Sequence, residues 1–305
     1  MDIKVYSAEF NAVRAPDRTR NRVMTNKRRL SFRKTVDAVA PPAASDYLAF
    51  HTGLSKSRVK DAMIKGAAWI TKKGAKRRRL RRAAAVLGPG DVLEFYYDES
   101  LLEIKPPAAR CLDDQQRYSV WFKPAGVMAQ GTDYGDHCSL LRLAEIHFRP
   151  QRPVFLVHRL DREVAGLMLI AHDRRAAAQL SALFRDNGIM KQYRVRVRGK
   201  IAEQRGEITL PLDGKRALTR YTVTDYDAVT DVAALDVTIE TGRLHQIRRH
   251  FAMIHHPVMG DPKYGIGNKN KKEGMQLAAV GLCFRSPFSG REVNYSIHDT
   301  VTDVL

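Results

Sequence analysis

Residues 154–171, VFLVHRLDREVAGLMLIA, place the charged tetrapeptide HRLD between two apolar runs. Each run has the length and the aliphatic composition of a buried strand. The chain therefore has to hold one carboxylate, Asp161, next to a histidine and an arginine where two buried segments meet. A sheet core with a charged loop satisfies this pattern, and the loop is the first candidate for a functional site.

Periodic patterns in the rest of the chain predict the class of fold. Alternating apolar and polar residues predict strands at 191–199 and 233–240, and apolar residues at helical spacing predict helices at 174–186 and 244–256. The sequence has no regular alternation of strands with helices, no glycine-rich phosphate loop and no internal repeat. We therefore expect an α+β fold with a mixed, largely antiparallel sheet and a few packed helices.

The charge of the chain is unevenly distributed. Residues 1–100 carry 22 basic and 10 acidic side chains, whereas residues 101–305 carry 30 and 23, for a formal net charge of +19. A cationic N-terminal third is typical of a nucleic-acid-binding appendage on an enzyme. An anionic membrane surface would attract such a segment equally well, so charge alone does not identify the partner.

Cysteine usage and the N-terminal residues bear on the compartment. Cys111, Cys138 and Cys283 are too scattered for a zinc pair and too few for a disulfide framework, which favours a reducing cytoplasm. The N-terminal MDIKVYSAEF lacks the apolar h-region of a signal peptide, and no stretch reaches the roughly 18 apolar residues of a membrane span. We expect a cytoplasmic protein without a membrane partner, and a monomer as the default oligomeric state.

Changes in composition divide the chain into three segments. Residues 1–43 are basic, end in a Pro-Ala linker and predict a mobile arm. Residues 44–98 contain two short helical patterns followed by short strands. With 305 residues the chain has room for about two domains, so we expect residues 99–305 to form the second, larger domain.

The 44–98 segment resembles the S4-like RNA-binding domain. The matching parts are Leu54-Ser55-Lys56-Ser57-Arg58, Gly66 at the end of the second helix, a strand at 68–71, and Gly90-Asp91 before the last strand. The resemblance implies that this module binds RNA.

A dense basic run, KKGAKRRRLRR at 72–82, supports the same expectation. It places eight cations within eleven residues, and like charges at this density repel one another unless phosphates neutralise them. The predicted contacts with the RNA backbone are Arg58, Lys72, Lys73, Lys76, Arg77, Arg78, Arg79, Arg81 and Arg82.

Several separated motifs resemble the pseudouridine synthases of the RluA type. FKPAG, FLVHRLDREVAGLMLIA, KQYRVRVRG and ETGRLHQIRRHFAMIHHPVMGDPKYG occur in the order and approximate spacing of that family, and the resemblance covers about residues 117–290. It implies a pseudouridine synthase catalytic domain that isomerises uridine in structured RNA to pseudouridine. It also implies that neither a metal nor an organic cofactor is needed.

The resemblance assigns the central roles to three residues. Asp161 is the essential carboxylate, which can act as a nucleophile or stabilise a cationic sugar. Because burial disfavours a charged carboxylate, a cation must lie against it, and the resemblance implies that Arg243 is this partner. Tyr193 is expected to pack on the target uracil. Whether Asp161 attacks the uracil ring or the ribose carbon stays open.

Further residues are expected to hold the flipped uridine. Flipping a base costs on the order of a few kcal/mol, and Arg159 is expected to occupy or clamp the space that the uridine leaves. Leu277 is expected to pack against the base, and Lys123 and Arg248 to contact the substrate. For His158 we favour a hydrogen bond that caps the loop over a substrate contact.

Two departures from the family pattern limit the assignment to a subgroup. Leu277-Ala278-Ala279 stands where the family usually has an apolar residue followed by His-Ala, and Val164-Ala165-Gly166-Leu167 replaces a Thr-Ser-Gly-Leu run. The modified uridine therefore cannot be read from the sequence. We expect ribosomal RNA rather than transfer RNA, because an appended RNA-binding module suits a large structured substrate.

Other functions are less well supported. The HRD-like loop lacks the remaining protein-kinase motifs, and the spacing of His245, His250, His255 and His256 does not predict a metal site. An N-glycosidic hydrolase would need a second carboxylate, for which Glu163 is the nearest candidate. A non-catalytic RNA-binding or ribosome-assembly protein would need only the basic surface.

Overall fold

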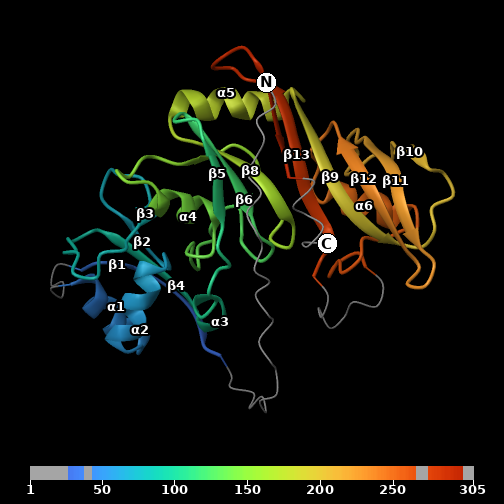
Figure 1. Cartoon of the computed structure of the whole chain (residues 1–305). Helices are drawn as coiled ribbons and strands as arrows, with labels where there is room; N and C mark the ends of the chain where they lie inside the picture. Colours follow the sequence, from blue (N-terminus) through green and yellow to red (C-terminus); the bar gives the residue numbers. More distant parts are fainter. Residues whose placement is uncertain (1–26, 38–42, 266–273, 298–305) are drawn as a thin grey trace. The chain divides into compact units, whose positions relative to one another are not determined.

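The chain forms two compact units in the computed structural model (Figure 1). The structure describes residues 27–37, 43–265 and 274–297. Of these, residues 107–129 and 144–297 belong to the larger unit and the remainder to the smaller unit. The smaller unit is thus more extensive than the predicted module at 44–98, because residues 99–106 and 130–143 also pack within it.

The smaller unit is built from short helices and one antiparallel sheet in the strand order β1-β4-β2-β3. Its elements are β1 (Arg29–Thr35), α1 (Ala44–Thr52), α2 (Lys56–Ile64), β2 (Ala68–Thr71), β3 (Arg78–Arg79), β4 (Val92–Asp98) and α3 (Glu99–Leu102). Ser55 caps α2 by accepting a hydrogen bond from the backbone N–H of Arg58, and Gly66 follows the helix with a φ of +87°. The two predicted helices and the strand at 68–71 are confirmed, whereas the S4-like assignment stays a prediction.

Strand β1 corrects the prediction of a mobile arm over residues 1–43. It pairs with β4 along its whole length, from Arg29 opposite Asp98 to Thr35 opposite Val92. Its apolar residues, Leu30 and Phe32, pack against the core of the smaller unit. The rest of the predicted arm, at 1–26 and 38–42, lies outside the described residues.

The larger unit contains a ten-stranded sheet whose main path runs β10-β11-β12-β9-β13-β8-β6-β5, with β14 paired to β13 and β7 to β8. Its elements are β5 (Arg110–Asp114), β6 (Tyr118–Lys123), β7 (Phe155–Leu156), β8 (Ala165–Ala171), α5 (Arg174–Arg185), β9 (Ile189–Arg198), β10 (Arg205–Ile208), β11 (Thr219–Asp227), β12 (Val232–Ile239), α6 (Gln246–Met253), β13 (Leu277–Arg285) and β14 (Glu292–Ser296). Helix α4 (Leu140–His147) crosses the boundary between the two units. Within the described ranges, no helix is long and apolar enough to cross a membrane.

The predicted mixed sheet is confirmed, and its parallel step lies beside the HRLD loop. Strands β8 and β13 pair in parallel, with Gly166 opposite Ala279, and the other strand pairs of this sheet that the structure describes are antiparallel. Gly166 has a φ of +129°, and a Cβ there would lie 2.2 Å from the carbonyl oxygen of Ala279. Only glycine allows the two strands to approach this closely.

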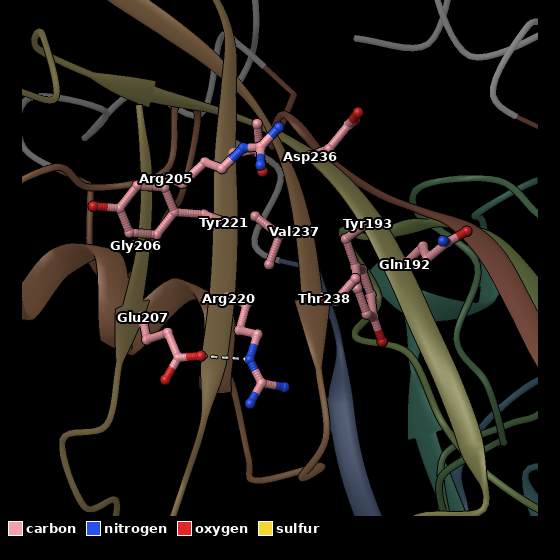
Figure 2. A pocket seen from close by; sticks show the side chains of 11 residues that line it. Gln192, Tyr193, Arg205, Gly206, Glu207, Arg220, Tyr221, Asp236, Val237 and Thr238 are labelled. Carbon is pink, nitrogen blue, oxygen red and sulfur yellow. Dashed lines mark hydrogen bonds and ion pairs between the residues drawn. The ribbon is translucent and has the colours of Figure 1, made fainter. Parts of the chain in front are cut away.

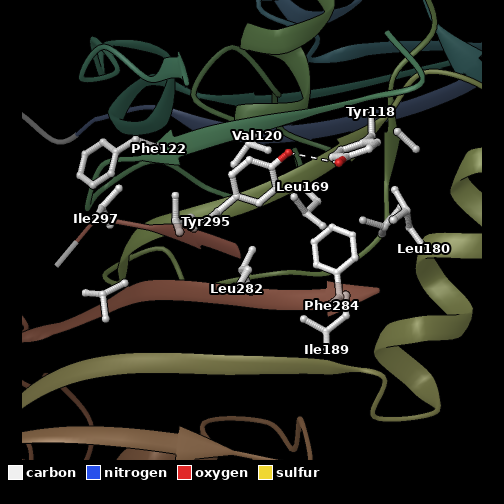
Figure 3. Close-up of a cluster of buried hydrophobic side chains, with 14 of the residues drawn as sticks. Tyr118, Val120, Phe122, Leu169, Leu180, Ile189, Leu282, Phe284, Tyr295 and Ile297 are labelled. Atoms are coloured by element: carbon white, nitrogen blue, oxygen red, sulfur yellow. Dashed lines mark hydrogen bonds between the residues drawn. The ribbon is translucent and has the colours of Figure 1, made fainter. Parts of the chain in front are cut away.

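Helices cover both halves of this sheet. Helix α6 packs against the half formed by β9 to β12, where the rings of Phe251 and Tyr221 lie 5.8 Å apart (Figure 2 shows the strands of this half). In the other half, α5 buries Leu180 in a core that also contains Leu169 and Phe284 (Figure 3). The predicted apolar face of the helix at 174–186 is therefore confirmed, whereas the helix predicted at 244–256 spans only 246–253 and leaves Leu244 outside it and exposed.

Candidate active site

Neighbouring strands bring the predicted functional residues together. Tyr193 lies on β9, Leu277 begins the adjacent β13, and Asp161 lies in the loop between β7 and β8, which neighbours β13. Backbone hydrogen bonds fix this loop: the N–H of Gly126 donates to the carbonyl of Arg162 at 2.7 Å, and the N–H of Val164 to that of Asp161 at 3.2 Å.

These side chains line one pocket of about 330 Å³. Six of the predicted residues contribute to it: Arg159, Asp161, Tyr193, Arg243, Arg248 and Leu277. Apolar side chains, among them Val164, Ile239 and Ile247, form much of the remaining wall. An apolar cavity of this size with a few converging polar groups is typical of a small-ligand site.

Arg248 is the ion-pair partner of Asp161. Its Nη1 donates to Oδ2 of Asp161 at 2.6 Å, while its Nε and Nη2 donate to Oδ2 and Oδ1 of Asp261 at 2.7 and 2.9 Å. The side chain of Arg248 is 4% exposed, that of Asp261 is 0% exposed, and that of Asp161 is 20% exposed. One guanidinium thus joins a fully buried carboxylate to a carboxylate that reaches the pocket.

The charges in this cluster stabilise one another. Burial opposes the charge of Arg248, but its hydrogen bonds with Asp261 and Asp161 outweigh that effect and raise its pKa. Burial likewise opposes the charge of Asp261, yet the bonds from Arg248 and from the backbone N–H groups of Tyr264 and Lys263 lower the pKa of this carboxyl. Arg248 therefore stays charged and oriented whether or not a ligand fills the pocket.

The predicted pairing of Arg243 with Asp161 is wrong. Arg243 lines the same pocket, but its Nε donates to the backbone carbonyl of Arg216 at 3.1 Å. Charged residues of a helix are usually exposed. Arg248 instead faces inward with Ile247 and Phe251, since Asp261 neutralises it there.

Tyr193 is half-buried in the wall of the pocket. Burial and the negative charge of Asp161 both raise the pKa of its hydroxyl. The phenol therefore keeps its proton at neutral pH, so it can donate a hydrogen bond or pack against a ring but is a poor proton acceptor.

His158 and Lys123, two of the predicted substrate contacts, do not line this pocket in the described structure. His158 accepts a hydrogen bond from the backbone N–H of Leu169 at 2.9 Å and stacks on Phe184, and burial lowers its pKa to about 3. The capping role favoured for His158 is therefore confirmed. Lys123 is fully buried, and its Nζ donates to the carbonyl of Val127 at 2.7 Å and more weakly to those of Pro124 and Arg162. Both residues support the loop that carries Asp161.

Three residues that sequence reasoning did not assign to the site belong to it. His245 lines the pocket with its Nε2 3.7 Å from Oδ2 of Asp161, and its Nδ1 lies 3.1 Å from the hydroxyl of Tyr264. Asp261 holds Arg248, as described above. The HP-x-x-GDP-x-YG motif contains both Asp261 and Tyr264, so it was the available signal, but the motif alone does not say what they contact.

The predicted RNA-backbone cations fall into two groups. Those with carboxylate partners are Arg58 (Glu99), Lys72 (Asp91), Arg77 (Glu94 and Asp133), Arg79 (Asp136) and Arg81 (Asp136). Arg77 and Arg79 also stack on the ring of Trp69, at 4.0 and 4.1 Å from its centroid. The expectation that only phosphates could neutralise the basic run is thus wrong for these residues. Lys73, Lys76, Arg78 and Arg82 are exposed and form no ion pair with any residue that the structure describes.

A second hollow of about 510 Å³ lies over β9 to β12 and shares Tyr193 with the pocket (Figure 2). Its charged side chains largely satisfy one another. Arg220 pairs with Glu207 at 2.6 Å and with Glu240, and Asp236 pairs with Arg194 at 3.4 Å. We therefore assign the chemistry to the smaller pocket, where one carboxylate is exposed to a ligand.

The pocket suits chemistry that uses one carboxylate. Asp161 is the only acidic residue among the described residues that line it, and its second oxygen is not occupied by Arg248. Glu163, the candidate second carboxylate, is not part of the lining. In the described ranges, no group of three or more His, Cys, Asp or Glu side chains could hold a metal ion. The site can thus present a fixed anion, a buried cation and an aromatic ring to a ligand.

The sequence is similar to those of known RNA pseudouridine synthases. Residues 117–253 match the sequence model of the family described as RNA pseudouridylate synthase. An uncharacterized RNA pseudouridine synthase of Mycoplasma pneumoniae is 27% identical over 286 residues, which cover 85% of this chain and 90% of that protein. The ribosomal large subunit pseudouridine synthase D of Zymomonas mobilis is 32% identical over 164 residues, which cover 46% of this chain and 51% of that protein.

A solved structure shares the fold. Human RNA pseudouridylate synthase domain containing 1 aligns with a TM-score of 0.54 and 22% sequence identity, covering 64% of this chain and 86% of that chain. This likeness supports the α+β fold class and its largely antiparallel sheet.

Proposed function

This chain belongs to the RNA pseudouridylate synthase family, of the RluA type, and we propose that it converts a specific uridine of ribosomal RNA to pseudouridine. Members of this family isomerise uridine in RNA. The choice of ribosomal RNA is supported by the similarity to the ribosomal large subunit enzyme of Zymomonas mobilis. It is also supported by the four predicted RNA-backbone cations that form no ion pair with a described residue, Lys73, Lys76, Arg78 and Arg82, which suit a large structured RNA.

The observation that carries the assignment of the site is the pairing of Asp161 with the buried Arg248. Pseudouridine formation breaks the bond between C1′ of the ribose and N1 of the uracil and then joins C1′ to C5. Asp161 is the anion that this step requires, either as the nucleophile or as the group that stabilises a cationic sugar. Arg248 holds that carboxylate in a fixed orientation through the 2.6 Å hydrogen bond from its Nη1.

The other residues of the pocket hold the uracil. Tyr193 packs on the ring, and Leu277, which is 4% exposed, packs against its edge. Arg159 is exposed at the pocket, where it clamps the RNA from which the uridine has been flipped. Arg243, which lines the same pocket, contacts the substrate in place of the ion-pair role first expected of it.

The alternative of an N-glycosidic hydrolase lacks its second carboxylate. A hydrolase needs a general base for water besides the group that stabilises the sugar. Asp261 is the nearest other acid on the Asp161 cluster, but both of its oxygens accept hydrogen bonds from Arg248 and it is fully buried.

The test uses purified protein with ribosomal RNA and transfer RNA transcripts. Nucleosides and free bases are quantified after digestion, and the target is located by carbodiimide modification and primer extension. We expect pseudouridine at one or a few positions of the ribosomal transcript and no free uracil. Modification of the transfer RNA alone contradicts the proposed substrate, and free uracil supports the hydrolase instead.

A further inference from the structure

Isomerisation of uridine requires a proton acceptor in addition to the carboxylate. When C1′ is joined to C5, that carbon still carries its hydrogen, and the ring is not aromatic. The C5–H bond must break so that its electron pair forms the C5–C6 double bond, while the N1–C6 double bond gives its electrons to N1. The proton that leaves C5 must find a base, and N1 must gain a proton.

Few groups in the pocket can accept a proton. The ionisable side chains in its described lining are Arg159, Asp161, Tyr193, Arg243, His245 and Arg248. The guanidinium groups have no acceptor site. Tyr193 keeps its phenolic proton because burial and Asp161 raise its pKa. Asp161 and His245 remain, and the proposed function already assigns Asp161 to the glycosidic bond.

The backbone places His245 where a base is needed. His245 precedes α6 with a φ of +53°, a left-handed conformation that few residues other than glycine and asparagine adopt. This conformation brings Nε2 to 3.7 Å from Oδ2 of Asp161, on the pocket side, while Nδ1 is within hydrogen-bond distance of the Tyr264 hydroxyl, at 3.1 Å. Tyr264 thereby orients the ring, and when Nδ1–H donates to its hydroxyl oxygen, Nε2 is free to accept a proton.

The surroundings of His245 lower the pKa of its imidazole, which favours the neutral ring before the reaction. Burial lowers its pKa, and so do the charges of Arg248 and Lys263, whereas Asp161 and Asp261 act in the opposite direction. A neutral ring has one free nitrogen lone pair, and once protonated it becomes a cation beside the Asp161 carboxylate. Asp161 therefore stabilises the product of proton transfer.

We propose that His245 is the base that takes the proton from C5 of the uracil onto Nε2 and then delivers it to N1. This inference rests on the proposed function. One side chain thus both removes the proton from C5 and supplies the proton to N1, while its Nε2 lies near Asp161 and its Nδ1 contacts Tyr264. No other proton donor or acceptor is required.

Three variants and a matched control test this role. His245→Asn retains a residue that tolerates a positive φ but cannot act as the base, and His245→Gly leaves space for added imidazole. Tyr264→Phe removes the hydroxyl that fixes the ring. The control is His255→Asn, because His255 also has a positive φ, of +66°, but is exposed and lies outside the pocket lining.

The experiment measures single-turnover pseudouridine formation on ribosomal transcripts made with ordinary or 5-deuterated uridine. We expect His245→Asn to react about 10²-fold more slowly or worse, with a larger deuterium isotope effect than the wild type because loss of the C5 proton becomes limiting. Imidazole should partly restore His245→Gly, Tyr264→Phe should slow the reaction less than His245→Asn, and His255→Asn should match the wild type.

Two outcomes overturn the inference while leaving the proposed function intact. One is a His245→Asn rate close to that of an active wild type. The other is a slower rate that shows neither a larger isotope effect nor rescue of His245→Gly by imidazole, which is the result for a purely structural histidine. If the wild-type protein itself forms no pseudouridine, the proposed function fails, and the inference fails with it.

Discussion

Arg248 and Asp261 form a buried ion pair with two hydrogen bonds, of 2.7 and 2.9 Å, and Arg248 uses its remaining Nη1 to hold Asp161. Asp261 is fully buried and also accepts hydrogen bonds from the backbone N–H groups of Lys263 and Tyr264. Asp261 therefore holds the arginine in place before any ligand enters the pocket. A carboxylate held in this way needs no reorganisation when charge develops on the substrate.

Asp161→Asn should abolish catalysis without weakening RNA binding. The amide keeps the size of the side chain but removes the only acidic group in the described lining of the pocket, and we expect a rate loss of about 10³-fold or more. Single-turnover kinetics and filter binding measure the two quantities. Glu163→Gln is the control, because Glu163 lies two residues away and outside the lining, and an equal loss of rate in this variant would contradict the assignment.

Asp261→Asn should destabilise the larger unit by about 3 kcal/mol, because it leaves the buried Arg248 guanidinium with only one carboxylate. Urea unfolding followed by the fluorescence of Trp121, with Trp69 replaced by Phe, measures this free energy. Asp213→Asn is the matched control: Asp213 pairs with the neighbouring Arg249, but its side chain is 69% exposed, so little change is expected. Equal losses of unfolding free energy in the two variants would show that the buried Arg248–Asp261 pair stabilises the protein no more than the exposed Arg249–Asp213 pair.

The burial of Lys123 predicts a pH dependence of stability. Burial lowers the pKa of Lys123 from 10.5 to about 7, while Glu163 and Asp161 oppose this shift. Between these values the unfolded chain binds the proton and the folded chain does not, so the free energy of unfolding should rise with pH across this window. Relative to Lys123→Met, which cannot titrate, the rise should be at most ~4 kcal/mol between pH 7 and 10. If the difference in unfolding free energy between the wild type and Lys123→Met stays constant from pH 7 to 10, the prediction is contradicted.

The unpaired cations of the smaller unit should account for much of the salt dependence of RNA binding. Replacing Lys73, Lys76, Arg78 and Arg82 with Ala should reduce the slope of log K against log salt by about 3, if each contacts one phosphate. Arg79→Ala should instead lower the stability of the smaller unit, because Arg79 pairs with Asp136 and stacks on Trp69. If the slope falls with Arg79→Ala but not with the fourfold variant, then Arg79 contacts the RNA phosphates and the four unpaired cations do not.

These point substitutions are a better test than deleting residues 1–98. Residues 130–143 pack in the smaller unit, where Asp133 and Asp136 accept hydrogen bonds from Arg77 and Arg81. A deletion would remove these partners and leave the two carboxylates without them. Loss of RNA binding would then not distinguish lost phosphate contacts from a disturbed fold.

Local sequence patterns predicted much of the fold but not all of it. The alternation at 191–199 and the apolar spacing at 174–186 correspond to β9 and α5, because in both the period of the pattern matches a buried face. Strand β1 was missed because only Leu30 and Phe32 of RLSFRKT are apolar, and its position depends on pairing with β4. The packing of 130–143 in the smaller unit depends on contacts between residues far apart in sequence, which local patterns do not contain.

Part of the site could be predicted from the sequence, where a recognised motif contains the reacting group. HRLD and the K-x-Y strand were enough to place Asp161 and Tyr193 in one pocket. The partner of Asp161 was assigned wrongly because the resemblance implied Arg243, whereas Asp161 pairs with Arg248, which Asp261 allows to be buried. His245 was not assigned to the site because its position depends on a positive φ that the sequence does not reveal.

Pseudouridine mapping in cells tests both the role of Asp161 and the identity of the RNA substrate. Ribosomal and transfer RNA from a strain that lacks this gene are compared with RNA from strains complemented with the wild type or with Asp161→Asn. We predict that a pseudouridine in ribosomal RNA disappears on deletion and returns with the wild type but not with the variant. Return of the modification with Asp161→Asn would contradict the role of the carboxylate, and full modification of ribosomal RNA in the deletion strain would contradict the proposed substrate.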